Sequence, residues 1–257
     1  KPLKPAITSG GLAVSSSAFI NHVHATYGIP LMRVDLERHE VRLGLKGSIL
    51  SLSQPLPDAA TVDQGLEHIE DYVQTIDLGK TPDPGFAKAS MFEALLYIFF
   101  SPFANEYMRR KRQAYGQVDP KGPRFLYIYG PTQNGKTTFF RFALKLVTGQ
   151  NMEAVPREEF SSRKIRGAAS IGTVFPLAFD DVEFSGKRWV PDVLKAYWET
   201  WWRGDLDVPQ LVLSSNEPRL QDWARSRVKR LDFDVHFAST EESKRKLKGL
   251  FERDNDV

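Results

Sequence analysis

The residues with the clearest chemical potential lie together in one short run, Gly130 to Thr137, with the sequence GPTQNGKT. This run fits the pattern G-x-x-x-x-G-K-[ST] at every required position. Glycines let such a loop wrap closely, so that backbone N–H groups point at phosphate oxygens. The side chain of Lys136 would reach the outer phosphates, and the Thr137 hydroxyl would hold Mg²⁺. The run therefore predicts a phosphate-binding loop.

The segments on either side of the loop agree with this interpretation. Residues 124–129 have the apolar character of a buried strand, and residues 138–147 have the spacing of an amphipathic helix. A helix that begins directly after the loop adds the partial positive charge of its N-terminus. A chance glycine turn is the alternative, and it is disfavoured because both flanks match. We expect the phosphate contacts to come from Gly130, Pro131, Thr132, Gln133, Asn134, Gly135, Lys136, Thr137 and Thr138.

A pair of carboxylates supplies the second part of a nucleotide site. Asp180 and Asp181 directly follow the apolar run 175–179. Asp180 would bind Mg²⁺ through water, and Asp181 would polarise the water that attacks the γ-phosphate. Glu183 is a second candidate for that role. Without the upstream phosphate loop, a strand followed by an acidic turn would be the favoured interpretation.

Further polar residues follow a third apolar run, 210–213. Asn216 would orient the attacking water and sense the γ-phosphate, although taken alone it would be interpreted as a turn residue. Arginines then follow within residues 223–233. A planar guanidinium suits the spread charge of a phosphoryl transition state on a neighbouring subunit, and a basic surface turn is the alternative. The candidates are Arg225, Arg227 and Arg230.

The order of these segments along the chain predicts an α/β fold. From about residue 121, apolar runs alternate with helical patterns, which implies a mainly parallel sheet with its ligand at the carboxyl ends of the strands. We expect a phosphate-loop domain over residues 121–257, preceded by a helical connector over 81–120 and a mixed α/β region over 1–80. Within the first two regions, helices are expected at 61–76, 86–97 and 104–115.

Composition narrows the class of protein. The 257 residues are 41% apolar and 26% charged, which is typical of a globular protein. The absence of cysteine excludes disulfides and thiolate metal sites, and it suits a cytoplasmic protein. No apolar run approaches the length of a membrane span. Positive charge is concentrated in residues 101–150, which include Arg109 to Arg112; this cluster is either a solvated helix end or a nucleic-acid patch.

Taken together, these motifs resemble the AAA+ class of P-loop ATPases, and within it the superfamily 3 helicases of small DNA viruses and phages. The resemblance rests on Gly130-Pro131 and Asn134 to Thr137, Phe179 to Asp181, Ser214 to Asn216, and Ser226 to Val228 running into Leu231 to Phe233. It implies ATP and Mg²⁺ as ligands and assembly into rings, usually hexamers, with each ATP between two subunits. It also implies that Lys136, Asp181, Asn216 and Arg227 are catalytic and that Thr137 and Asp180 hold the metal. Arg227 would be the arginine finger, the residue that reaches the γ-phosphate bound to a neighbouring subunit. Arg225 and Arg230 are less favoured for that role.

One segment departs from the pattern of these helicases. They carry a long β-hairpin with basic residues at its tip between the acidic and asparagine motifs, whereas residues 194–209 here leave little room after an expected helix through Trp202. Arg203 is the single basic residue near a possible tip. Trp198, Trp201 and Trp202 would either stack on bases or fill a core, and the core is favoured.

Two hypotheses about function therefore remain open. The first is a ring-forming ATPase that remodels nucleic acid, with DNA as the favoured partner. The second is an ATP-gated oligomerisation module that controls an effector such as a nuclease, without moving along DNA. No membrane association is expected in either case. A weaker pattern, His22 and His24 on one face of a strand followed by Asp35, Glu37 and His39, could suggest a metal site.

Overall fold

A four-stranded parallel sheet forms the centre of the molecule, in the strand order β10-β7-β9-β8. The computed structural model describes residues 5–45, 48–53, 55, 57–116, 121–203 and 206–255. Strands β7, β8 and β9 are short, mostly apolar runs, as expected for strands covered on both faces, whereas the edge strand β10 mixes apolar and charged residues. The mainly parallel α/β fold predicted from the sequence is confirmed. The strands are β7 (Phe125–Tyr129), β8 (Leu177–Phe179), β9 (Leu211–Ser215) and β10 (Val228–Asp232).

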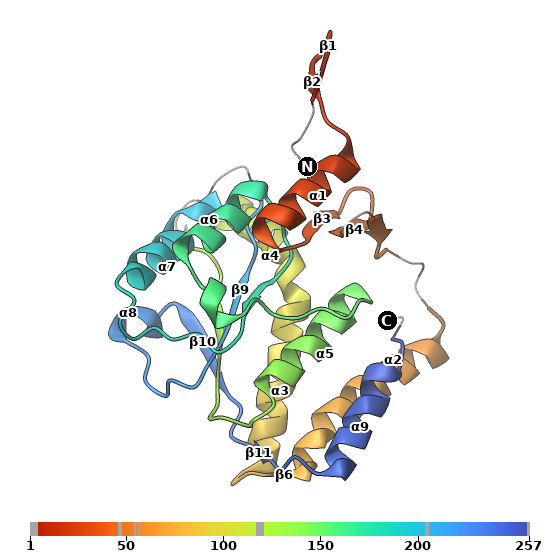
Figure 1. The fold of residues 1–257 in the computed structure, drawn as a ribbon, viewed down its shortest axis with the longest axis vertical. Helices are drawn as coiled ribbons and strands as arrows, with labels where there is room; N and C mark the ends of the chain where they lie inside the picture. The colour runs from red at the N-terminus through yellow and green to blue at the C-terminus, as the bar shows by residue number, and fades with distance from the viewer. Residues whose placement is uncertain are drawn as a thin grey trace.

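Alternate residues of the central strand β7 enter two different cores, because successive side chains of a strand point to opposite faces. Phe125 and Tyr127 pack with one set of helices, and Leu126 and Ile128 pack with another. The sheet is therefore the middle of three layers (Figure 1). The first face is covered by α4 (Ala104–Tyr115), α6 (Ser162–Ile171) and α7 (Trp189–Glu199). The second is covered by α2 (Ala59–Val73), α3 (Pro84–Phe100), α5 (Lys136–Thr148) and α9 (Glu241–Glu252).

Helices α2, α3, α6 and α9 begin where the sequence provides a side-chain N-cap. Asp58 and Asp83 accept backbone hydrogen bonds at the starts of α2 and α3, and Pro84 occupies the first turn of α3, where its missing N–H costs nothing. The three helices expected before the sheet are present, as α2, α3 and α4. The helix expected through Trp202 ends earlier: α7 stops at Glu199, and a 3₁₀ turn, η5 (Trp201–Arg203), follows.

Packing is continuous across the two boundaries drawn from the sequence at 80/81 and 120/121. The expected linker contributes β6 (Gly79–Lys80), which pairs with β11 (His236–Phe237) far along the chain. Helix α3 shares a core with β7, β10 and α5. The three-part division of the chain therefore stays a prediction about its organisation. Short elements complete this part of the fold: η1 (Gln74–Leu78), η2 (Ser101–Phe103), η4 (Arg157–Glu159) and α8 (Asp222–Arg225).

The first part of the chain is a mixed α/β region, with five short strands and one helix among its described residues before α2. A hairpin of β1 (Ala6–Thr8) and β2 (Gly11–Ala13) projects from the body, and a helix, α1 (Ser16–Tyr27), follows it (Figure 1). His22 and His24 lie on this helix, so their expected placement on a strand is wrong. Among the described residues, no group of three or more possible ligands is placed to hold a metal ion. An antiparallel sheet of β3 (Leu31–Asp35), β4 (Glu40–Leu45) and β5 (Ser48–Ser51) completes this region.

Helix α9 lies beside α2 (Figure 1), and the end of α9 is hydrogen-bonded to α2 and α5. Its final carbonyl groups have no partners within the helix and therefore need donors from elsewhere. His68 Nε2 lies 2.8 Å from the carbonyl oxygen of Leu250. Lys145 Nζ donates to the carbonyl oxygens of Phe251 at 2.6 Å and Arg253 at 2.8 Å. In the part of the chain that the structure describes, no helix is long and apolar enough to cross a membrane.

Candidate functional site

The loop between β7 and α5 folds tightly around its own asparagine. A Cβ atom added to Gly130 would lie 1.3 Å from Asn134 Nδ2 and 2.9 Å from the carbonyl oxygen of Phe233. Asn134 is buried, and its Nδ2 donates to that carbonyl at 2.9 Å. Gly135 has φ +79°, a conformation that side chains rarely adopt, and helix α5 starts at the next residue. Both glycines of the motif are therefore required by this loop.

The lysine of the motif points back into the loop. Its Nζ donates to the carbonyl oxygens of Gly130 at 2.6 Å and Pro131 at 3.1 Å. It also donates to the side-chain oxygens of Asn134 at 3.0 Å and Asn216 at 2.8 Å. Lys136 thus joins the loop to the end of β9. These neutral oxygens occupy positions around the ammonium group that phosphate oxygens would take in a nucleotide complex.

The charge of Lys136 is held in a poorly hydrated place. The residue is 7% exposed, and this burial lowers the pKa of the ammonium group from its ordinary value of 10.5. The negative charges of Asp181 and Asp180 act in the opposite direction, but more weakly. An anionic ligand would stabilise this charge far better than the neutral oxygens do.

The first carboxylate meets the loop threonine. Thr137 Oγ1 donates to Asp180 Oδ2 at 2.5 Å, which places a hydroxyl and a carboxylate side by side near the start of α5. Ser214 Oγ donates to the other oxygen of Asp180, also at 2.5 Å, and accepts from the backbone N–H of Asp181 at 2.8 Å. Ser214 is fully buried and orients both carboxylate residues. Ser214 belongs to one of the motifs named above, but the sequence alone assigns it no role, because it resembles the polar end of an apolar strand.

The second carboxylate meets the asparagine at the end of β9. Asn216 Nδ2 donates to Asp181 Oδ1, while its Oδ1 accepts from Lys136. Asp181 has φ +55°, which is uncommon for a residue with a side chain and marks a sharp turn after β8. The second candidate, Glu183, pairs instead with Arg157 Nη1 at 3.2 Å. No hydrogen bond described in the structure joins Glu183 to the loop.

Two of the three candidate arginines, Arg227 and Arg225, do not lie at this end of the sheet. Arg227 directly precedes β10, at the amino end of the strands, whereas the phosphate loop follows the carboxyl end of β7. Its Nη2 pairs with Glu199 at 2.5 Å, and its guanidinium lies over the ring of Trp198, 5.1 Å from the centroid. Arg225 pairs with Asp222 on the surface. Arg230 is the exception, because its side chain lies at the same end of the sheet as the loop: it pairs with Asp232 at the end of β10, lies over Tyr129 at the end of β7, and donates to the carbonyl oxygen of Pro218 at 2.6 Å.

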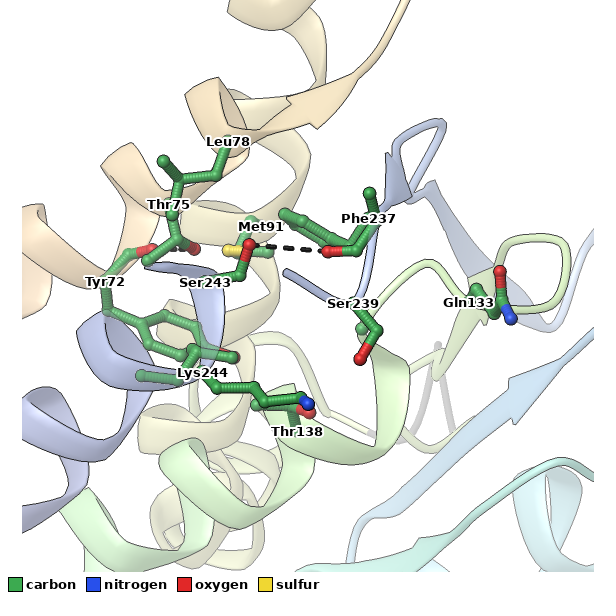
Figure 2. A pocket seen from close by; sticks show the side chains of 13 residues that line it. Tyr72, Thr75, Leu78, Met91, Gln133, Thr138, Phe237, Ser239, Ser243 and Lys244 are labelled. Atoms are coloured by element: carbon green, nitrogen blue, oxygen red, sulfur yellow. Dashed lines mark hydrogen bonds between the residues drawn. The ribbon is translucent and has the colours of Figure 1, made fainter. Parts of the chain in front are cut away.

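A largely apolar cavity of about 230 Å³ lies beside the loop. Figure 2 shows Gln133 and Thr138 on the loop side, with Tyr72 and Met91 from the helices on the far side. Most of the remaining wall comes from six residues within 237–247. No sequence signal could have assembled this set, since its members come from segments far apart along the chain. The lining residues are Tyr72, Thr75, Leu78, Met91, Gln133, Gly135, Thr138, Phe237, Ala238, Ser239, Ser243, Lys244 and Leu247.

The tryptophans serve the core rather than an open surface. Trp198 is 8% exposed and Trp202 is 3% exposed, and both pack in the core that covers one face of the sheet. Trp201 is partly buried, with Arg166 over its ring at 5.4 Å. Among residues 189–203 and 206–210, which the structure describes, there is no β-strand and hence no hairpin of the helicase kind. Residue 204 and residue 205 lie outside the described part.

The basic cluster on α4 is partly neutralised by nearby groups. Arg109 pairs with Asp207 at 2.9 Å, and Arg110 pairs with Glu106 at 2.7 Å. Arg112 donates to the carbonyl oxygen of Trp202. These contacts fit a structural use of the cluster at least as well as a nucleic-acid patch.

A family model for the Aq_aa27 P-loop NTPase domain matches residues 49–219, which is most of the chain and includes the loop, the carboxylates and the asparagine. This chain belongs to that family. The Aq_aa27 match runs across the predicted boundaries at 80/81 and 120/121, as the packing does. The prediction of a P-loop NTPase domain from the glycine loop is confirmed.

More distant comparisons add little to the Aq_aa27 assignment. No curated protein matches the chain. One similar solved structure is the SCCmec type IV Cch active helicase, with 16% identity and a TM-score of 0.42 over 63% of this chain and 32% of that one. Another is the JCV helicase, with 17% identity and a TM-score of 0.35 over 75% of this chain and 60% of that one. This chain therefore spans less than two thirds of either protein, and likenesses this distant carry no argument about its activity.

Proposed function

We propose that this P-loop NTPase domain binds ATP together with Mg²⁺ and hydrolyses the γ-phosphate bond. The observation that carries the proposal is the chain of contacts from Lys136 through Asn216 to Asp181, at the carboxyl edge of the sheet. A cation, an amide and a carboxylate in this order provide a phosphate ligand, a positioning group and a base. The reaction would be an in-line attack of water on the γ-phosphate.

Each residue of the site would have a distinct role. Lys136 would exchange its loop acceptors for phosphate oxygens and balance the charge that develops on them. Asp181 would accept a proton from the attacking water, and Asn216 would hold both that water and the carboxylate in place. The hydroxyl of Thr137 and the carboxylate of Asp180 fit Mg²⁺, because they are adjacent oxygen ligands and Mg²⁺ takes its other ligands from water and phosphate. Bound there, Mg²⁺ would neutralise phosphate charge.

The nucleoside part of ATP would enter the cavity beside the loop. Its walls are mainly apolar, and the polar side chains of Gln133, Thr138 and Ser239 stand near the loop side (Figure 2). Such a cavity suits a flat base on apolar walls with a few polar contacts. The cavity adjoins the start of α5, where the phosphates would bind.

We further propose a homo-oligomeric ring, hexameric by resemblance, in which one subunit supplies an arginine to its neighbour's γ-phosphate. Arg227 is the first candidate, and its pair with Glu199 would have to open in the assembly. Arg225 is the more exposed candidate, with 73% of its side chain accessible. The position of both residues at the end of the sheet opposite the loop supports a role in trans rather than in cis.

In its first form, the proposal is a helicase-like ATPase that remodels nucleic acid, with DNA as the favoured partner and a cytoplasmic location. In its second form, ATP binding drives oligomerisation and switches an effector such as a nuclease, without movement along DNA. The second form is favoured by the interval before β9, where the described residues hold no strand for a DNA-binding hairpin. Residues 1–80 would then be the accessory region through which the effector is controlled.

Steady-state ATP hydrolysis, measured with and without single-stranded and duplex DNA, tests both forms. Lys136→Ala is the blank, because it removes the loop cation. Hydrolysis that DNA strongly stimulates, and that Lys136→Ala abolishes, supports the helicase-like form. Slow hydrolysis indifferent to DNA, together with ATP-dependent assembly, supports the switch. Absence of both ATP binding and hydrolysis in the intact chain would refute the proposal.

A further inference from the structure

A hairpin at the start of the described chain exposes an apolar surface. We call residues 6–13 the arm. Ile7 and Leu12 are cross-strand partners, so their side chains lie side by side on one face of the arm. They are 88% and 71% exposed, which makes them the most exposed aliphatic side chains among the described residues. The surrounding sequence, PAITSGGLAVSS over residues 5–16, contains no charged residue. Such a surface is suited to burial rather than to water.

The arm is too small to be a stable hairpin without packing on another surface. Each strand has three residues, and an isolated two-stranded hairpin is marginally stable at best in water. Figure 1 shows the arm projecting from the body beyond α1. All of its described residues are exposed. The arm would therefore gain stability by packing its apolar face on another surface.

A second exposed apolar surface runs along α3, η2 and α4. We call it the stripe, and its members recur at spacings of four, four, three and four residues, which places them on one side of the helical path. At a rise of about 1.5 Å per residue it is about 22 Å long. The opposite side of α3 packs in the core, so the helix is apolar all round. The stripe consists of Phe92, Leu96, Phe100, Phe103 and Tyr107, which are 36–49% exposed.

Charged groups that flank the stripe already have partners. Glu93 pairs with Lys229 at 2.5 Å. Glu106 pairs with Arg110 at 2.7 Å and lies 3.7 Å from Arg109. An uncharged apolar segment could therefore cover the stripe without leaving an unpaired charge buried beneath it. A charged or strongly polar partner would fit this surface less well.

We propose that the arm of one copy of this chain packs on the stripe of a second copy. The two surfaces match in chemistry: the arm presents two aliphatic side chains and no charge, and the stripe presents aromatic and aliphatic ridges with neutralised flanks. In the proposed arrangement the contact is head-to-tail: the arm of each copy packs on the stripe of the next, and the contact repeats from copy to copy. The interface adds the surfaces of assembly to the proposed oligomer and does not depend on nucleotide chemistry.

Site-directed cross-linking tests the contact directly, because the chain contains no cysteine of its own. Leu12→Cys and Leu96→Cys are prepared separately, mixed without nucleotide and oxidised. We expect a disulfide-linked dimer in the mixture and little in either variant alone. Leu12→Cys mixed with Ser170→Cys, an exposed position on α6, measures random collision. Cross-linking of Leu96→Cys with itself above that background would overturn the proposal in favour of a stripe-to-stripe dimer.

Complementation between two defective variants gives a second test. The double variant Ile7→Asp/Leu12→Asp introduces two charges on the arm. The double variant Leu96→Asp/Phe100→Asp introduces two charges on the stripe. All four positions are exposed, so both variants should keep the thermal transition of the parent protein. By light scattering, we expect the parent to form concentration-dependent oligomers, each variant to be monomeric, and their equimolar mixture to stop at dimers. A parent that is monomeric at its highest soluble concentration, or an arm variant that assembles fully, would overturn the proposal. Because no nucleotide is present, failure here is separate from failure of the ATPase.

Discussion

Asn216 donates its side-chain amide to the carboxylate of Asp181, across the gap between the carboxyl ends of β9 and β8. The same amide accepts from Lys136, so one side chain links the phosphate-binding cation to the proposed base. We expect Asn216→Ala to lower kcat by about 100-fold, since the base and the attacking water lose their common support. ATP affinity should change little. Stopped-flow measurements give the ATP affinity and steady-state turnover gives kcat, with Asn151→Ala, at an exposed position, as the control. Unchanged kcat would remove Asn216 from the mechanism.

Ser214 should set the response to Mg²⁺, because its hydroxyl holds Asp180 and the backbone of Asp181. Loss of a group that orients a metal ligand typically weakens metal binding 10- to 100-fold. We therefore expect Ser214→Ala to raise the Mg²⁺ concentration for half-maximal hydrolysis by about 10-fold. The neighbouring Ser215 is equally buried but donates to the carbonyl oxygen of Val182. Ser215→Ala should lose stability without shifting the Mg²⁺ titration, and equal shifts in both variants would contradict the assignment.

The first glycine of the loop should tolerate no side chain. A Cβ atom at Gly130 would overlap the amide of Asn134, which is itself fixed by a buried hydrogen bond. We expect Gly130→Ala to weaken ATP binding by at least about 10-fold, because the loop must move away from its phosphate-binding shape. Gly249 on α9 has open space around it and serves as the matched control. Gly249→Ala should bind ATP normally and gain up to about 1 kcal/mol of stability from helix propensity. Isothermal titration and thermal unfolding provide both readings.

Filling the cavity should separate recognition of the nucleoside from recognition of the phosphates. Ser239 is exposed at the cavity, so a larger residue there should not disturb the core. We expect Ser239→Trp to weaken ATP binding by about 10-fold or more, which corresponds to about 1.4 kcal/mol. Binding of inorganic tripolyphosphate, measured by competition, should be unchanged because it does not use the cavity. If both ligands weaken equally, or neither weakens, the base does not bind there.

His68 should make stability fall in mild acid. Burial lowers its pKa from the ordinary 6.5; the nearby positive charges of Arg253 and Lys145 add to this, while the hydrogen bond to the Leu250 carbonyl and the charge of Asp71 oppose it. A lowered pKa means that the unfolded chain takes up the proton first as pH falls. The contribution of His68 is therefore complete above 6.5 and is lost as pH falls through its folded-state pKa.

Urea unfolding from about pH 7 to about pH 5 measures this contribution, with His68→Gln as the variant. We expect the stability difference between parent and variant to shrink as pH falls. His236→Gln, at an exposed position on β11, is the matched control. A pH profile that His68→Gln leaves unaltered would contradict the inferred role.

The sequence predicted those features whose signal is local. Glycine, lysine and threonine at fixed spacing specify the loop, and continuous apolar runs specify the strands on either side of it. Asp180, Asp181 and Asn216 could be placed at one edge because each follows such a run in a parallel sheet. Their hydrogen bonds in the structure agree with that placement.

Features assembled from distant segments could not be predicted in this way. Helix α1 contains polar and β-branched residues with weak helix preference, so tertiary contacts decide its conformation. The cavity needs Tyr72 and Leu247 to meet beside the loop, which only the fold can bring about. The ion pair of Arg227 with Glu199 joins residues 28 positions apart, and neither residue alone signals it.

The position of Arg227 determines how many nucleotide sites can be complete in an assembly of this chain. It lies at the amino end of β10, while the phosphate loop lies at the carboxyl end of β7, in strands that run the same way. If the finger acts between subunits, an open row always leaves one nucleotide site without an arginine and one arginine without a site. Only an assembly that closes on itself removes both the incomplete site and the unused arginine. The smallest fully competent unit would then be the whole closed circle, and kcat per subunit should rise with the fraction of circles that are complete.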